Sequence, residues 1–285
     1  MILLKCLLYS LILVLVGCNN QDTPAKQFDP AQLGLIESTL NRLMVEQAIQ
    51  MANTIANEAN GFQLVPSWQP IKSTTGKEVF VYILRSENLA KSEMIFVPME
   101  CKQCVFLQNS DFHDWLNKYS DKQNASLKLD DYTVLAFLLL HELGHVHQGE
   151  SSGAVNSSNE SYNIKDTHQK EIERAADEFA ASKIREAASK KGESRATTAM
   201  LVEIELSKLS WNLSAIRLLD HFGGTVINSH DLFWDMGYTH PNFELRILTV
   251  NNLVTQTETS YNLLKDFKDH IVNQPDILYQ RDKVR

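Results

Sequence analysis

The sequence of 285 residues contains little glycine, proline or cysteine, with 11, 7 and 4 residues respectively. Disordered low-complexity chains and collagen-like rods need far more glycine and proline, so the composition excludes both classes. Basic residues are also too few to favour nucleic acid as a partner, because 27 lysines and arginines stand against 35 acidic residues and the net charge is −8. The chain has no internal repeat and no series of long apolar runs, so repeat arrays and multi-pass membrane proteins are excluded. The remaining composition, 44% hydrophobic and 22% charged, is that of a globular protein.

The first 17 residues have the pattern of a secretory signal. One lysine precedes an apolar run over residues 7–16, which is too short to remain as a membrane-spanning helix. Residues 15–18 (LVGC) resemble a bacterial lipobox, in which Cys18 would become the acylated first residue of the mature protein. Asn19 at the next position resembles the pattern of outer-membrane sorting. We therefore expect a polar tether over residues 18–30 and a lipid-anchored protein on the periplasmic side of the outer membrane; an ordinary signal peptide or a short anchor is the alternative.

Cys101 and Cys104 form a CxxC pair. In an oxidising compartment such a pair favours a local disulfide. A zinc ribbon would need a second pair, which the sequence lacks. A thioredoxin-like redox site would need a helix after the pair, and the residues after Cys104 do not start one convincingly. A structural disulfide is the prediction.

The most informative stretch is residues 134–149, VLAFLLLHELGHVHQG, which contains an HExxH motif. On a helix, His141 and His145 lie one above the other and can direct two imidazoles at one point, with Glu142 beside them. This is the arrangement of a catalytic zinc site, in which the metal lowers the pKa of its water to about 7 and a glutamate takes the proton. The alternative is a chance match on a helix with surface or internally bonded histidines. The apolar surroundings indicate a buried helix, where unpartnered polar side chains would cost several kcal/mol.

A third ligand is expected on the helix that covers residues 171–181. No third histidine follows at the metzincin spacing, but Glu173 and Asp177 lie four apart, 28 and 32 positions after His145. Glu173 would supply a carboxylate oxygen, and Asp177 would accept a hydrogen bond from the far nitrogen of a ligating histidine. Ala176 and Ala180 would allow this helix to approach the HExxH helix closely. The alternative is a solvated charged face.

The other elements follow from periodicity and turn residues. Together they predict a mostly helical α+β fold with a small sheet. Helices are expected over residues 31–60, 109–119, 201–220 and 250–275, and strands over residues 79–84 and 94–97, with two or three strands in all between 62 and 98. Asp130 or Asp131 is expected to cap the HExxH helix, and Asn109, Ser110 or Asp111 the helix over 109–119.

The motifs resemble one known family. HExxH followed by ExxxD on a second helix is the gluzincin pattern, and residues 239–247 (THPNFELRI) resemble the late THPxxxxRI signature of the HtpX-like, CaaX-prenyl-protease-like zinc metallopeptidases. The three motifs occur in that family's order and cover about residues 135–247. The spacing from HExxH to ExxxD is shorter than in most of the family. The periplasmic, lipid-anchored or soluble branch fits the chain best.

The resemblance implies one Zn²⁺ per chain with three ligands: His141, His145 and Glu173. Glu142 would be the general base, and His240 would hydrogen-bond the developing oxyanion or only shape the turn before a proline. Asp177 and Arg246 would lie around the ligands. The expected fold is a zincin-like core whose small sheet flanks the HExxH helix, in a single domain over residues 31–285.

The resemblance also implies an activity. The expected function is a zinc-dependent endopeptidase of the cell envelope that acts on a protein or peptide substrate. Two alternatives remain open. One is a zinc-bound lipoprotein that works as an envelope chaperone or assembly factor with little proteolysis, and the other is a purely structural helical lipoprotein with a chance HExxH.

Overall fold

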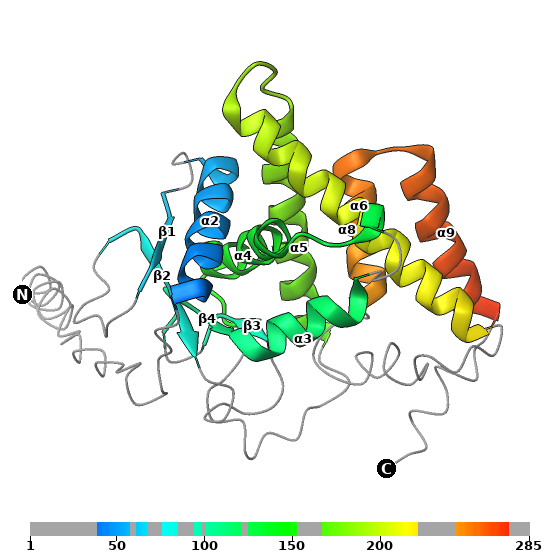
Figure 1. Ribbon diagram of the computed structural model, residues 1–285, viewed down its shortest axis with the longest axis horizontal. Helices are drawn as coiled ribbons and strands as arrows, with labels where there is room; N and C mark the ends of the chain where they lie inside the picture. The colour runs from blue at the N-terminus through cyan, green and yellow to red at the C-terminus, as the bar shows by residue number, and fades with distance from the viewer. Residues whose placement is uncertain are drawn as a thin grey trace, which may run out of the picture.

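The computed structural model describes residues 39–57, 61–67, 76–84, 94–98, 101–120, 125–152, 167–221 and 243–273 (Figure 1). The helices are α2 (Thr39–Ala56), α3 (Asn109–Tyr119), the short 3-10 helix η4 (Ala125–Leu127), α4 (Asp131–Gln148), α5 (Thr167–Ala188), α6 (Ser194–His221), α8 (Phe243–Thr255) and α9 (Glu258–Asn273). The strands are β1 (Gln63–Pro66), β2 (Glu78–Leu84), β3 (Ile95–Phe96) and β4 (Cys104–Gln108). The expected α+β class, mostly helical with a small sheet, is confirmed.

Several sequence predictions fall outside the described residues. These are the signal peptide, the lipid-bearing Cys18, the tether and His240.

The four strands form one mixed sheet in the order β1-β2-β4-β3. β1, β2 and β4 run parallel, and β3 is antiparallel to β4, with Ile95 opposite Leu107. Successive residues of β2 pack on opposite faces of the sheet, in two different hydrophobic clusters. Val81 belongs to one cluster and Tyr82 to the other. The central strands therefore bury both faces, as strands of parallel sheets usually do.

Strand β4 was not predicted. It begins at Cys104, the second cysteine of the CxxC pair, beyond the region over which strands are predicted. The strand is defined by its pairing with β2, in which Phe80 lies opposite Cys104. These two residues are 24 positions apart, so a local sequence pattern does not show the pairing. Predicted strands 79–84 and 94–97 correspond to β2 and β3, and β1 lies in the same predicted region.

The β1 edge of the sheet is blocked by a side chain. Asn53 of α2 accepts a hydrogen bond from the Leu64 backbone N–H at 2.9 Å and donates one to the Leu64 carbonyl at 2.8 Å. Pro66 at the end of β1 has no N–H to offer. The opposite edge, β3, lies nearer the HExxH helix, since the residue that follows it, Val97, is joined to the segment after α4.

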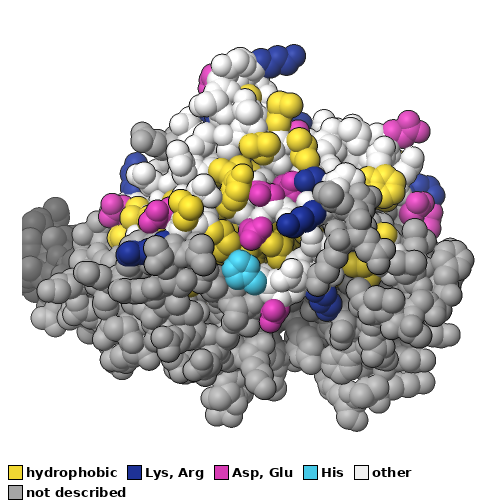
Figure 2. Space-filling model, in the orientation of Figure 1, with side chains coloured by type: hydrophobic (Ala, Val, Ile, Leu, Met, Phe, Trp, Pro, Cys, Tyr) yellow, Lys and Arg dark blue, Asp and Glu magenta, His cyan; other side chains and the backbone are white. Residues whose placement is uncertain are grey.

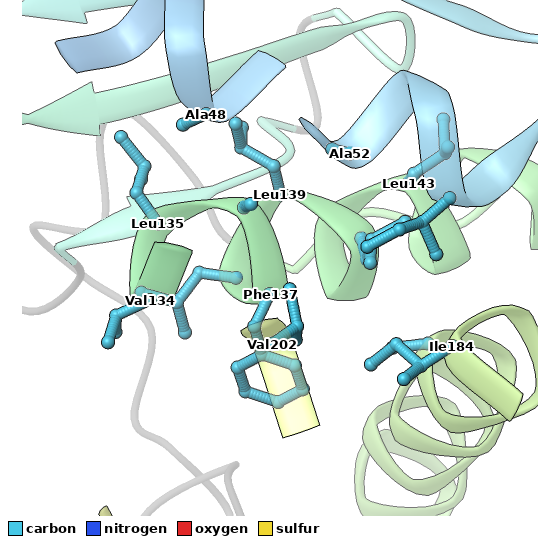
Figure 3. Packing of buried hydrophobic residues seen from close by; sticks show 14 of the residues in the cluster. Ala48, Ala52, Val134, Leu135, Phe137, Leu139, Leu143, Ile184 and Val202 are labelled. Atoms are coloured by element: carbon cyan, nitrogen blue, oxygen red, sulfur yellow. The ribbon is translucent and has the colours of Figure 1, made fainter. Parts of the chain in front are cut away.

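Helix α4 is the centre of the core. Fourteen of its residues, from Thr133 to Val146, are buried. Leu135 and Leu139 face Ala48 of α2, and on another side Phe137 lies beside Val202 of α6 (Figure 3). The helix ends are fixed by local chemistry. The Asp130 side chain accepts a hydrogen bond from the Thr133 backbone at 3.1 Å, which confirms one of the two predicted caps, and Gly149 ends the helix with a φ of +73°.

The prediction of one helix over residues 250–275 was wrong. α8 ends at Thr255, Gln256 takes a left-handed φ of +50°, and α9 begins at Glu258. Thr257 Oγ1 accepts a hydrogen bond from the Ser260 backbone at 3.2 Å, so Thr257 caps the new helix. The apolar rhythm continues across the break, which is why periodicity alone did not reveal it.

The predicted caps of α3 were also wrong. The residue before the helix is Gln108, which makes no side-chain cap hydrogen bond, and Asn109, Ser110 and Asp111 already belong to the helix. α3 begins directly at the end of β4, so the chain passes from strand to helix without a turn that would use a polar cap.

Some apolar side chains reach the surface. On the face drawn in Figure 2 they gather near the middle, among acidic and basic side chains. The large hydrophobic residues that are about half exposed include Leu43 of α2 and Met200, Leu201 and Ile204 of α6. Such residues are normal on a folded chain and mark no site by themselves. None of the described helices combines the length and the apolar character needed to cross a membrane.

Candidate functional site

The HExxH residues of α4 lie inside the protein. His141, Glu142 and His145 have 5%, 3% and 0% of their surface exposed. The helical i, i+4 spacing brings the two imidazoles together, with His141 Nε2 and His145 Nε2 only 3.0 Å apart. The three residues offer ligand atoms that all lie within 4.8 Å of one another, so this buried group could hold a metal ion.

Glu173 reaches the same point from α5. Its two carboxylate oxygens lie 3.3 Å from His141 Nε2 and 3.5 Å from His145 Nε2, and its side chain is fully buried. Nitrogen and oxygen ligands at 2.0–2.2 Å from a tetrahedral zinc ion are about 3.3–3.5 Å from one another. The two nitrogen–oxygen distances match that range, and the two Nε2 atoms are somewhat closer together, at 3.0 Å.

A glycine allows α5 to come this close. A Cβ atom at Gly144 would lie 2.9 Å from Ala176 Cα and 3.2 Å from Ala176 Cβ. Only a glycine on α4 opposite an alanine on α5 leaves the two backbones room to touch. Ala176 lies three positions after Glu173 on the same helix, so this contact fixes where along α4 the Glu173 side chain meets the histidines.

Asp177 and Arg246 surround the three converging side chains. Asp177 Oδ1 lies 2.9 Å from His141 Nδ1, the ring nitrogen that does not face His145. Arg246 of α8 donates to Asp177 through Nε at 2.9 Å and Nη2 at 3.0 Å, and its Nη1 lies 3.1 Å from a Glu173 oxygen. Its Nη2 also lies 3.0 Å from His141 Nε2. These contacts tie α4, α5 and α8 together at one buried polar cluster, defined by six residues: His141, Glu142, His145, Glu173, Asp177 and Arg246.

The charges of the cluster depend on one another. Burial and the Arg246 charge lower the pKa of His141, but Asp177 and Glu173 outweigh them and raise it to about 9. Burial raises the pKa of Asp177, but Arg246 and His141 outweigh it and lower the pKa to about 2. Burial lowers the pKa of Arg246, and the two carboxylates raise it above its usual range. These shifts favour the charged forms of Asp177 and Arg246 and, without a metal, the protonated form of His141.

The charge balance also fits a metal. A histidine must be neutral to act as a ligand. With both histidines neutral and all three carboxyl groups ionised, the single guanidinium would leave the buried polar cluster with a formal charge of −2. A divalent cation would balance that charge, and it would compete with the proton for His141 Nε2.

Ser152 is a member of this region that the sequence did not reveal. Its Oγ donates a hydrogen bond to Glu142 Oε2 at 2.8 Å, and both side chains are buried. The Val97 backbone N–H donates to Ser152 Oγ at 2.7 Å, and the Ser152 N–H donates to the Val97 carbonyl at 3.0 Å. Ser152 stands in a serine- and glycine-rich stretch, where no feature distinguishes it from its neighbours.

Cys101 and Cys104 are joined by a disulfide, with their Cα atoms 5.4 Å apart. Between them, Lys102 Nζ donates to the Gly149 carbonyl at 2.5 Å, at the C-terminal end of α4. A positive charge is favourable there because the helix end carries partial negative charge. The disulfide turn thus contacts the end of the HExxH helix and not the buried polar cluster.

A cavity of about 660 Å³ lies elsewhere, between α2, β1 and the start of α6. Asn53, Leu64 and Arg195 are among its lining residues, and no member of the buried polar cluster is. The chemistry of the HExxH group therefore gives this cavity no role.

Comparison with known proteins finds one family. Residues 131–264, from the start of α4 into α9, match the family Peptidase U49. No curated protein and no solved structure matches the chain. The match and the buried HExxH group together indicate a peptidase with a site that could bind a metal ion. The part of the chain that holds the site is thus similar to a family of hydrolases acting on peptide bonds.

Proposed function

We propose that this chain is a zinc-dependent endopeptidase. The zinc ligands would be His141, His145 and Glu173, and Glu142 would be the general base. The observation that carries the proposal is the convergence of three buried side chains from two helices, whose nitrogen and oxygen atoms lie 3.0–3.5 Å apart. The match to a peptidase family over the same helices supports it.

The residues around the ligands prepare them for this role. Asp177 accepts the Nδ1 proton of His141, which favours the tautomer with its lone pair on Nε2, the nitrogen that a metal would bind. Arg246 holds Asp177 with two hydrogen bonds and so fixes its orientation. His240, by the resemblance to the HtpX-like family, would hydrogen-bond the oxyanion.

The reaction follows from these roles. A zinc ion held by His141, His145 and Glu173 would supply Lewis acidity to the scissile carbonyl and to water. Glu142 takes a proton from water as the water oxygen bonds to the carbonyl carbon. Glu142 then passes that proton to the departing nitrogen as the C–N bond breaks, so the products are a carboxylic acid, which keeps the second water proton, and an amine.

The test is metal content and peptidase activity of the purified full-length chain. We expect about one zinc per chain in the wild type, much less in Glu173→Ala, and an unchanged content in Glu171→Ala, a control from the exposed side of the same helix. Glu142→Gln should keep zinc and fold but lower kcat by a factor of roughly 10²–10⁴. Activity is measured on a quenched fluorescent peptide selected from a mixed library.

The outcomes separate the alternatives. Zinc retained in Glu173→Ala would show that the third ligand lies elsewhere. Zinc bound by a wild type that cleaves no peptide, with a cellular phenotype that survives Glu142→Gln, would favour the envelope chaperone. A wild type without metal would contradict the zinc site altogether.

We propose further that the peptidase works at the periplasmic face of the outer membrane, anchored by an acyl group on Cys18. The lipobox-like residues 15–18 and the outer-membrane pattern of Asn19 support this placement.

A further inference from the structure

Ser152 links the proposed general base to the sheet. Its hydroxyl lies between the Val97 backbone N–H at 2.7 Å and Glu142 Oε2 at 2.8 Å. The Ser152 N–H returns a hydrogen bond to the Val97 carbonyl at 3.0 Å. Ser152 is therefore held by two hydrogen bonds to Val97, the residue that follows β3, and it has only 6% of its surface exposed.

The direction of these hydrogen bonds is fixed by chemistry. A backbone N–H can only donate, so Ser152 Oγ must accept from Val97. The single hydroxyl proton of Ser152 then points to Glu142 Oε2, which accepts it. Within the described part of the chain, no other hydrogen-bond donor to Glu142 is found.

We propose that Ser152 is the positioning residue of Glu142 in peptide hydrolysis. By donating to Oε2, Ser152 would hold the carboxylate in one rotamer and leave Oε1 as the oxygen that takes the proton from water. This inference rests on the proposed function, because it assumes that Glu142 is the general base.

The physical need for such a residue lies in the flexibility of glutamate. A glutamate side chain has three rotatable bonds, and a general base must lie within hydrogen-bond reach of the proton that it removes. Helix α4 fixes only the Cα and Cβ atoms of Glu142. Ser152 fixes a second point of the side chain, the Oε2 atom. Ser152 is itself hydrogen-bonded to Val97, which directly follows β3.

The segment that carries Ser152 is itself held at its start. Gly149 ends α4 in a left-handed conformation, and Lys102 from the disulfide turn donates to the Gly149 carbonyl. The Glu150 N–H donates to the His145 carbonyl at 3.0 Å. The position of the Ser152 hydroxyl is thus set from both sides, at Gly149 and at Val97.

The first test compares two variants of nearly equal shape. Ser152→Thr keeps the hydroxyl and Ser152→Val removes it, and Ser151→Ala is the control at the neighbouring, less buried serine. With a single quenched fluorescent peptide, we expect kcat of the valine variant to be about 10–100-fold below that of the threonine variant, with KM within about twofold. The control should have wild-type kcat. Zinc content should be the same in all of these variants.

The second test needs neither zinc nor activity. In the zinc-free full-length chain, the unfolding equilibrium is measured for Ser152→Ala, Glu142→Ala and the double variant. If the hydroxyl bonds the carboxylate, the change in the unfolding equilibrium constant of the double variant should differ by roughly fivefold or more from the product of the two single changes. For the control pair, Ser151→Ala and Glu142→Ala, the change in the unfolding equilibrium constant of the double variant should equal the product of the two single changes.

The outcomes distinguish this inference from the proposed function. Equal kcat for the valine and threonine variants, while Glu142→Gln is inactive, would overturn the role of Ser152 and leave the peptidase intact. A large drop in kcat with no coupling in unfolding would also overturn it, since the loss would then arise elsewhere. Full activity of Glu142→Gln would instead overturn the proposed function, whatever the coupling.

Discussion

Arg246 places one positive charge against two buried carboxylates, those of Glu173 and Asp177. Replacing it by glutamine keeps much of the volume and removes the charge. We expect the free energy of unfolding of the zinc-free protein to fall by about 3–5 kcal/mol, because a buried charge pair that loses one partner leaves the other charge uncompensated. Excess zinc should restore part of this loss by supplying positive charge to the same oxygens. Urea unfolding with chelator and with excess zinc measures both effects.

The matched control for this change is Arg174→Gln on α5. Arg174 faces Glu178 at 3.7 Å, and both side chains are more than 60% exposed. Such a pair contributes at most about 1 kcal/mol, so the control should unfold almost as the wild type does. An Arg246→Gln variant as stable as this control would show that Arg246 does not compensate the carboxylates.

At the residue scale, the sequence predicted which side chains converge but not what holds them. The separations of four residues in HExxH and ExxxD express helix geometry, so His141, His145, Glu173 and Asp177 could be chosen from spacing alone. Ser152 could not be chosen, because its role depends on the fold of a loop against Val97. The placement of Arg246 around the ligands came only from a family resemblance, and its contact with Asp177, 69 positions away, was not predicted.

At the element scale, the approach of α5 to α4 depends on Gly144. We expect Gly144→Ala to be destabilising, although alanine favours helices by about 1 kcal/mol over glycine. The new Cβ would meet the Ala176 backbone at 2.9 Å, and overpacking against backbone costs roughly 1–3 kcal/mol. The larger effect should be on zinc affinity, because α5 must move away and take Glu173 with it.

Competition with a zinc-binding dye measures that affinity, and urea unfolding measures the stability. Affinity should fall by tenfold or more, while the HExxH residues themselves remain unchanged. A variant with wild-type zinc affinity and increased stability would show that α5 adjusts without displacing Glu173.

Which elements could be predicted follows from how local their signals are. α4 has its caps, and α5 its small and charged residues, within the local sequence, and both helices were predicted. The break between α8 and α9 depends on Thr257 as a cap inside a continuous apolar rhythm, and β4 depends on pairing with β2. These features are set by tertiary structure or by one side chain, and periodicity does not detect them.

At the scale of the whole molecule, the proposed anchor limits what the peptidase can reach. The residues between Cys18 and Thr39 number 20, and a fully extended chain of that length spans at most about 70 Å. Substrates would therefore have to come within that distance of the membrane surface. An acyl anchor would concentrate the enzyme there, which favours membrane-bound or membrane-delivered proteins as substrates.

If the chain is anchored through Cys18, removing the anchor should change the location of the protein but not its catalytic activity. In cells grown with labelled palmitate, the wild type should incorporate label and sediment with outer membranes, whereas Cys18→Ser should lose the label and move to the aqueous periplasmic fraction. Cys6→Ser is the matched control, because Cys6 would leave with the signal and its loss should change neither result. Purified Cys18→Ser should keep the zinc content and kcat of the wild type, since residues 131–264 hold the site. A Cys18→Ser chain that is still labelled and membrane-bound would contradict the anchor without affecting the peptidase, because the two proposals depend on separate parts of the chain.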